Sequence, residues 1–135
     1  RIVLGADTVV AVDNIILGKP RDQSHAEAFI AMLSNRSHKV LSSVALVFPS
    51  NPGQPRLETQ ISESTVWFRE ISTAERQAYC QLDEPMDKAG GYAIQGVAAT
   101  FISRLEGSYS GVMGLALYET LELLSRAGIS PLVNS

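Results

Sequence analysis

Two parts of the chain have a hydrophobic pattern typical of β-strands, in which apolar and polar residues alternate or short apolar runs occur. The first part lies at the start of the chain. Residues 2–12 are rich in Val and Ile and predict a strand that is interrupted by the polar Asp7. Asp13 and Asn14 then predict a turn. Residues 15–17 return as a short second strand.

The second part predicts a long hairpin in the middle of the chain. Residues 38–50 form its first arm, which we expect to end at Pro49 because proline cannot donate a ladder hydrogen bond. Residues 51–56 contain two prolines and a glycine and predict an exposed turn. Residues 57–71 alternate as the returning arm.

Three helices are predicted from capping signals and apolar faces. Two of them open with a capping box, a serine followed three residues later by a glutamate: Ser24 with Glu27, and Ser72 with Glu75. The first helix is expected over 24–33, and the second must end before Pro85. The third is expected over 112–126, with Ser110 as its cap and Gly128 as its stop.

Residues 90–105 mix glycines with apolar runs and predict a loop that leads into one or two strands. Strands and helices thus alternate around hairpin pairings, which predicts an α/β or α+β fold with a mixed sheet. The chain has 135 residues, of which 45% are hydrophobic, and this fits a single domain over 1–135.

Composition argues against several classes of protein. We find no apolar run of transmembrane length and no basic-then-apolar leader, so we expect a soluble, cytoplasmic protein without a membrane partner. The single cysteine, Cys80, cannot form an internal disulfide, and we expect it to be buried. The net charge of −3 argues against a nucleic-acid partner, but a few converging lysines could still bind a small phosphorylated ligand.

Two motifs near the start could carry chemistry. In GADT, Asp7 lies within a Val-rich strand, where a carboxylate is costly unless it is exposed, paired or bound to a metal; a polar bulge would also explain it. In GKP, Lys19 lies at the exit of the second strand. It is either a ligand for an anion or an ordinary surface lysine.

The stretch DEPMDKAGGYAIQG, residues 83–96, holds the densest set of candidates. Lys88 precedes Gly90 and Gly91, whose backbone N–H groups could approach an anion closely. Gln95 lies among apolar residues, where a buried amide could read the edge of a base. The alternative is a glutamine that satisfies neighbouring backbone groups.

Other polar residues favour structural roles. Arg69 fits a solvated strand end, and helix capping explains Ser110 more simply than phosphate binding does. His25 and His38 fall in or beside polar surface segments, which argues against a Ser-His-Asp or Cys-His site. There is no Walker loop and no G-x-S-x-G elbow. These residues alone predict an α/β domain with a cleft for an anionic ligand.

Taken in order, GADTVV, GKPRD, TVWFR, EPMDKAGGYAIQG and GSYSGVMGLAL resemble the Maf family of nucleotide pyrophosphatases. The likeness spans almost the whole chain. Within that family, DKAGGYAIQG looks like the branch that acts on dTTP and UTP, and not like the branch that acts on 7-methyl-GTP. The resemblance implies an α/β domain with a long, twisted, mixed sheet flanked by helices, commonly in a homodimer.

The resemblance also implies a reaction, in which water cuts a nucleoside triphosphate between its α and β phosphorus atoms with the help of a divalent cation such as Mg or Mn. The implied role is housecleaning of nucleotides, linked in some members to septum formation and cell division. By the matching motifs, Asp7 corresponds to the acid proposed as general base or metal ligand. Thr8 and Gln95 correspond to positions that influence base selection, and Lys19 and Lys88 to basic residues near the triphosphate.

The chemistry of these side chains agrees with that reaction. Attack at phosphorus needs an activated water and compensation for charge on the leaving pyrophosphate, which Asp7 and the two lysines could supply. The amide of Gln95 offers both a donor and an acceptor to the O4 and N3 edge that thymine and uracil share.

Family members carry a Ser-x-Ser-Pro-Arg-Arg signature upstream of GADT, and this chain does not contain it. The resemblance therefore predicts a domain truncated at its N-terminus, with an incomplete phosphate site and an exposed sheet edge. The alternative function is a non-catalytic nucleotide-binding or interaction module.

Overall fold

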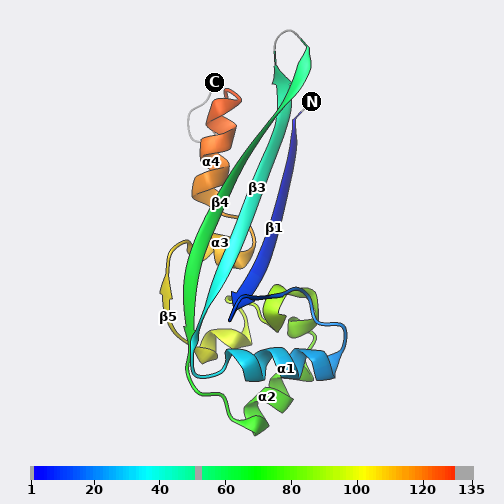
Figure 1. The fold of residues 1–135 in the computed structure, drawn as a ribbon, viewed down its shortest axis with the longest axis vertical. Helices are drawn as coiled ribbons and strands as arrows, with labels where there is room; N and C mark the ends of the chain where they lie inside the picture. Colours follow the sequence, from blue (N-terminus) through cyan, green and yellow to red (C-terminus); the bar gives the residue numbers. More distant parts are fainter. Residues whose placement is uncertain (1, 51–52, 130–135) are drawn as a thin grey trace.

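The centre of the molecule is a long sheet of five strands in the order β2-β1-β3-β4-β5 (Figure 1). The structure is a computed structural model that describes residues 2–50 and 53–129. The strands are β1 (Val3–Val12), β2 (Ile15–Leu17), β3 (Ser37–Ser50), β4 (Gln54–Phe68) and β5 (Ile102–Glu106). The strands fall where they were predicted, within 2–17, 38–71 and 90–105 to within a few residues, and the predicted sheet flanked by helices is confirmed.

Every strand pairing among the described residues is antiparallel, so the prediction of a mixed sheet was wrong. The positive φ angles of Asp13 and Asn14, 51° and 63°, make the tight turn that folds β2 back on β1. β3 and β4 form a hairpin, whereas Figure 1 shows that the helices before β3 and after β4, α1 (Gln23–Leu33) and α2 (Thr73–Cys80), lie at one end of the sheet. The chain therefore re-enters the sheet at the end where it left, and does not cross over to run parallel.

The helices are α1 (Gln23–Leu33), α2 (Thr73–Cys80), α3 (Tyr109–Met113) and α4 (Leu117–Arg126). Three short 3-10 helices, η1 (Glu84–Asp87), η2 (Ala89–Gly91) and η3 (Val97–Phe101), fill the region between α2 and β5. No helix in the described part of the chain is long and apolar enough to cross a membrane.

Within the described residues, helices cover only one face of the long strands. Along β3, the side chains of Val40, Ser42, Val44 and Leu46 are buried, whereas the residues between them are more exposed. Near one end, Val10, Val40 and Val66 pack in a core with α1. Towards the other end, Leu123 of α4 packs in a second core, against Val44, Leu46 and Phe48.

The edge of β1 is largely unpaired. β2 pairs only with Val10–Val12, so among the described residues no strand lies beside residues 3–9 on that side. Within the described residues this part of the β1 edge is therefore exposed. It also leaves one side of β1 open at the place where the predicted acid Asp7 lies.

Two local predictions need correction. β3 continues through Pro49, because Pro49 lies opposite Pro55 and neither residue is required to donate there. α1 begins at Gln23, because the carboxylate of Asp22 accepts a hydrogen bond from the N–H of His25 at 2.8 Å and caps the helix in place of Ser24. The capping box of α2 is confirmed.

The predicted third helix is in fact two helices. Ser108 caps α3, and the chain breaks at Gly114, where φ is 126°. The hydroxyl of Ser110 accepts the N–H of Leu117 at 3.0 Å and so links the two helices. Ser110 thus has a structural role, but at a different place from the one predicted.

Candidate functional site

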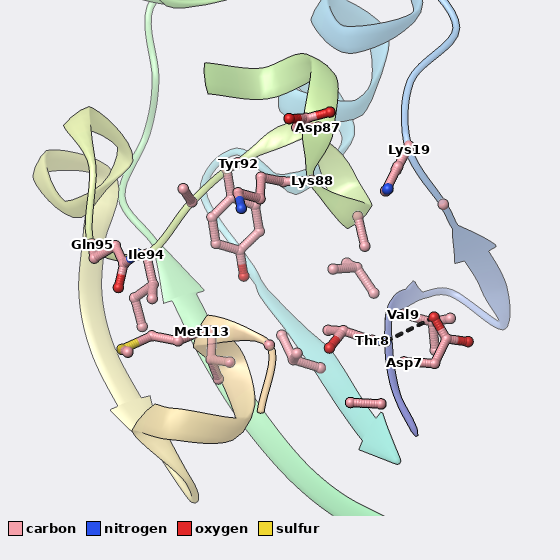
Figure 2. A pocket seen from close by; sticks show the side chains of 18 residues that line it. Asp7, Thr8, Val9, Lys19, Asp87, Lys88, Tyr92, Ile94, Gln95 and Met113 are labelled. Atoms are coloured by element: carbon pink, nitrogen blue, oxygen red, sulfur yellow. Dashed lines mark hydrogen bonds between the residues drawn. The ribbon is translucent and has the colours of Figure 1, made fainter. Parts of the chain in front are cut away.

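A pocket of about 380 Å³ opens on the helix-covered face beside the unpaired edge of β1 (Figure 2). It gathers segments that are distant in the sequence: residues 6–10, 18–19, 87–89, 92–95 and 112–114, with Val40 from β3. Of the predicted site residues, Asp7, Thr8, Lys19, Lys88 and Gln95 line it. The structure therefore brings together the motifs that the sequence separates.

The two ends of the pocket differ in chemistry. Figure 2 shows Lys19 and Asp7 on one side, and Gln95, Ile94 and Met113 on the other, with Tyr92 and Lys88 between them. Charged groups at one end can bind an anion. The other end combines apolar side chains with one amide, which suits a flat ring with polar edges.

Asp7 and Thr8 project from opposite faces of β1, because successive side chains of a strand alternate. The hydroxyl of Thr8 lies 3.2 Å from that of Ser42, on the helix-covered face. Asp7 is exposed at the rim of the pocket, and its carboxylate accepts the N–H of Thr8 at 3.0 Å. The carboxylate is therefore held locally but is still open to solvent.

The described residues contain no group of three or more His, Cys, Asp or Glu that could hold a metal ion. Two carboxylates, those of Asp7 and Asp87, do line the pocket. Magnesium is often bound by one or two carboxylates together with the phosphates of a substrate. Figure 2 shows the two carboxylates apart, with Lys19 between them and the Asp7 carboxylate directed outward, so a cation here would depend on the oxygens of a phosphorylated ligand.

Gly90 and Gly91 do not line the pocket, and their expected free N–H groups are already engaged. Gly90 donates to the carbonyl of Gly18 at 3.0 Å, and Gly91 donates to that of Lys88 at 3.0 Å. The first bond ties the loop of Lys88 to the strand exit that carries Lys19. The glycines therefore tie the segments that carry the lysines together and do not themselves line the pocket.

Gln95 lies on an exposed turn at the pocket wall, and not in the buried setting that its neighbours suggested. Among the described residues, its side-chain amide has no hydrogen-bond partner, so the alternative role of satisfying neighbouring backbone groups is wrong for these residues. The amide is free to bind a ligand.

The loop that follows Gln95 is held by Glu84, which the sequence reasoning missed. The Glu84 carboxylate accepts the N–H of Val97 at 2.9 Å and that of Ala98 at 3.3 Å, and also the hydroxyl of Tyr79. Gly96 leaves room for it, since a Cβ there would lie 1.9 Å from Glu84 Oε1. Glu84 thus fixes the turn that presents Gln95.

We expect Glu84→Ala to lower the free energy of unfolding by about 2 kcal/mol, because it removes the acceptor of three donors. Urea unfolding measures the change. Glu70→Ala, an exposed glutamate in the segment between β4 and α2, is the matched control and should change stability by less than about 0.5 kcal/mol. Equal losses in the two variants would contradict the role of Glu84.

His38 also differs from its prediction. It lies on β3 with 3% of its surface exposed, and Nε2 is 2.7 Å from the hydroxyl of Tyr92, so its assignment to a polar surface was wrong. Because side chains alternate along β3, His38 lies on the helix-covered face. The polar residues beside it in the sequence had suggested a surface position. His25 is partly exposed on α1 and accepts the N–H of Arg21 at 3.0 Å.

Two further residues have structural roles. Arg69 donates to both carboxylate oxygens of Glu75, at 3.1 and 2.8 Å, and to the carbonyl of Thr100 at 2.9 Å, so it ties β4 to α2 and is not a free strand end. Cys80 is buried, as predicted, and burial raises the pKa of its thiol to about 11. A thiol with such a pKa is a poor nucleophile at neutral pH.

The chain is similar to known proteins over most of its length. Residues 1–127 match the family described as Maf-like protein. The chain is 54% identical over 128 residues to a dTTP/UTP pyrophosphatase of Nitrosomonas europaea, covering 95% of this chain and 59% of the relative. It is 53% identical over 122 residues to a protein of the same name from Alkalilimnicola ehrlichii, covering 90% and 57%.

A third relative with this name, from Bordetella avium, is 50% identical over 128 residues, covering 95% of this chain and 61% of the relative. The chain therefore spans about three fifths of the length of the relatives that it matches.

Proposed function

Because the chain belongs to the Maf-like protein family, we propose that its pocket binds a nucleoside triphosphate, and that the natural protein carrying it hydrolyses dTTP and UTP to the monophosphate and pyrophosphate. The observation that carries the proposal is the composition of the pocket, with Lys19 and Asp7 at one end and the free amide of Gln95 at the other. A nucleotide has the same polarity, with phosphates at one end and a base at the other.

In the proposed reaction, a water oxygen forms a bond to the α phosphorus, and the bond from that phosphorus to the bridging oxygen of the β phosphate breaks. Pyrophosphate leaves with the bonding electrons. Asp7 orients the water and accepts its proton. Lys19 and Lys88 offset the negative charge that develops on the leaving group, as positioned cations do in phosphoryl transfer.

A divalent cation, Mg or Mn, would bind at Asp7, with Asp87 as the second carboxylate in the pocket. When bound, it supplies charge neutralisation at the phosphates. The exposure of Asp7 leaves its carboxylate free to meet a cation that enters with the substrate.

At the other end, we propose that Gln95 reads the edge of the base and that Thr8 helps to shape the pocket. Gln95→Met keeps the length of the side chain but removes both the donor and the acceptor. We expect it to lower the ratio of kcat/KM for UTP over CTP by about tenfold, while the kcat for UTP changes by less than about threefold.

Steady-state pyrophosphate release from UTP and CTP measures this change. Gln77→Met, on the exposed surface of α2 away from the pocket, is the control and should leave the ratio unchanged. A Gln95→Met protein with the wild-type ratio would remove Gln95 from base recognition.

The experiment that tests the function is a substrate panel of dTTP, UTP, CTP, GTP and 7-methyl-GTP, with Mg or Mn, using the complete natural protein that carries this chain. We expect pyrophosphate and a monophosphate from dTTP and UTP, and much slower release from the others. Nucleotide binding without turnover would instead support a non-catalytic binding module. Preferred hydrolysis of 7-methyl-GTP would contradict the proposed branch.

We also propose that the natural protein is a homodimer, that it has no nucleic-acid partner and that it has a housecleaning role. The net charge of −3 supports the second of these, since nucleic-acid-binding domains carry a basic excess. Sedimentation of the complete protein would test the first, and a monomer at micromolar concentration would contradict it.

A further inference from the structure

A buried histidine and a tyrosine form a pair at the inner wall of the pocket. His38 lies on β3, and its Nε2 is 2.7 Å from the hydroxyl oxygen of Tyr92, which lines the pocket. Edge-on contacts hold both rings: the centroid of His38 is 5.0 Å from that of Phe68 and 5.4 Å from that of Tyr92. These contacts restrict the orientation of both rings.

The surroundings of the other ring nitrogen of His38 indicate which partner donates the hydrogen bond. Nδ1 is buried and has no hydrogen-bond partner among the described residues. If Nδ1 carried the proton, a buried N–H donor would be left without an acceptor, and such orphaned donors are rare. A bare lone pair on Nδ1 is less costly. The neutral ring therefore carries its proton on Nε2, and Nε2–H donates to the oxygen of Tyr92.

The charge of His38 is consistent with a single proton on the ring. Burial, followed by the positive charge of Arg36, lowers the pKa of His38 to about 4. The ring is therefore neutral at neutral pH, when only one nitrogen donates. The pairing has one direction, from His38 to Tyr92.

Because the oxygen of Tyr92 accepts from His38, its own hydrogen must be donated elsewhere. Figure 2 shows the hydroxyl end of Tyr92 directed into the pocket, between Met113 and Thr8. Burial raises the pKa of Tyr92 above its ordinary value, so the hydroxyl keeps its proton. The pocket thus contains a fixed O–H donor close to the turn of Gln95.

We propose that Tyr92 is a specificity-determining residue that donates a hydrogen bond to a carbonyl oxygen of the bound base, and that His38 is the positioning residue that sets the direction of this donor. This rests on the proposed function, since it takes the ligand to be a nucleotide. A hydroxyl that already accepts from His38 and keeps its own hydrogen for the pocket favours a carbonyl over an amino group at the same place. It would therefore favour a keto pyrimidine over an amino pyrimidine.

The first test reads the tautomer of His38 directly. Long-range proton–nitrogen NMR spectra of the complete natural protein, labelled with ¹⁵N-histidine, show which ring nitrogen carries the proton. The signal that is lost in His38→Leu identifies the residue. We expect a proton on Nε2 at neutral pH; a proton on Nδ1 would overturn the proposal. This readout does not depend on catalysis.

The second test measures discrimination between bases. We expect Tyr92→Phe to raise the KM for UTP about tenfold with little change in kcat, and to leave CTP almost unaffected. His38→Leu should lower the same UTP over CTP ratio in the wild type but not in a Tyr92→Phe background, which a purely structural role would not produce. Tyr118→Phe, which changes an exposed tyrosine on α4, is the matched control.

The outcomes separate this proposal from the proposed function. If the protein binds UMP more tightly than CMP in calorimetry but hydrolyses neither triphosphate, the proposed function fails. The difference in binding would still support recognition of the base. An unchanged preference in Tyr92→Phe would overturn the role of Tyr92. A protein that binds neither UMP nor CMP would overturn both.

Discussion

Asp7→Asn is expected to reduce the turnover of UTP by about a thousandfold in the complete natural protein while leaving its fold intact. A positioned general base contributes roughly 10²–10⁴ to a rate, and asparagine cannot accept the proton of water. The fold should survive because Asp7 is exposed, and an amide oxygen can still accept the N–H of Thr8. Pyrophosphate release gives the rate, and thermal unfolding checks the fold.

Asp83→Asn provides the control for this change. Asp83 is an exposed acid that does not line the pocket, so its amide variant should keep the wild-type rate. Turnover within threefold of wild type in Asp7→Asn would remove Asp7 from the mechanism. A lost melting transition in that variant would show a structural role instead.

Gly90→Ala is expected to lower the free energy of unfolding by about 3 kcal/mol and to reduce activity. Gly90 has a φ of 72°, which costs an alanine roughly 1–2 kcal/mol. A Cβ at this position would also lie 2.9 Å from Cγ2 of Val10, which is buried on β1, and such overpacking typically costs about 1–3 kcal/mol. Because Gly90 ties the Lys88 loop to Gly18, the lysines would shift as well.

Gly91→Ala is a matched control within the same loop. Its φ of 80° imposes the same backbone strain, but the nearest atoms to its Cβ would lie 3.8 Å away, which is an ordinary contact. Urea unfolding of the two variants therefore isolates the clash with Val10. We expect Gly91→Ala to lose about half as much stability as Gly90→Ala. Equal losses would contradict the close approach of this loop to β1.

Local signals predicted much of the fold. The capping box of Ser72 and Glu75, the turn at Asp13 and Asn14, and the strand-like runs act over a few residues, and the structure confirms each of them. The antiparallel direction of the two hairpins, β1–β2 and β3–β4, was predicted in this way, but the direction of β3 relative to β1 and of β5 relative to β4 could not be. These directions depend on where α1 and α2 pack, which is decided by the core and not by the residues of the strands.

The residues of the candidate site differ in the same way, since local signals predicted some of them and contacts between distant residues determine the others. Motif residues such as Asp7, Lys19 and Gln95 could be found because unusual polar residues interrupt apolar or glycine-rich segments. Glu84 and His38 were missed because their partners are distant in the sequence: Glu84 binds the N–H of Val97, and His38 contacts Tyr92. One signal for His38 was available, since the alternation of β3 places it on the same face as Val40.

The most direct measurement is a crystal structure of the complete natural protein with a UTP analogue whose α–β bridging oxygen is replaced by nitrogen, so that it cannot be cut there. The account predicts the phosphates beside Lys19 and Lys88, and the base between Gln95 and Tyr92, with the Tyr92 hydroxyl within hydrogen-bond distance of a base carbonyl. An analogue bound in the reverse direction, or outside this pocket, would contradict it.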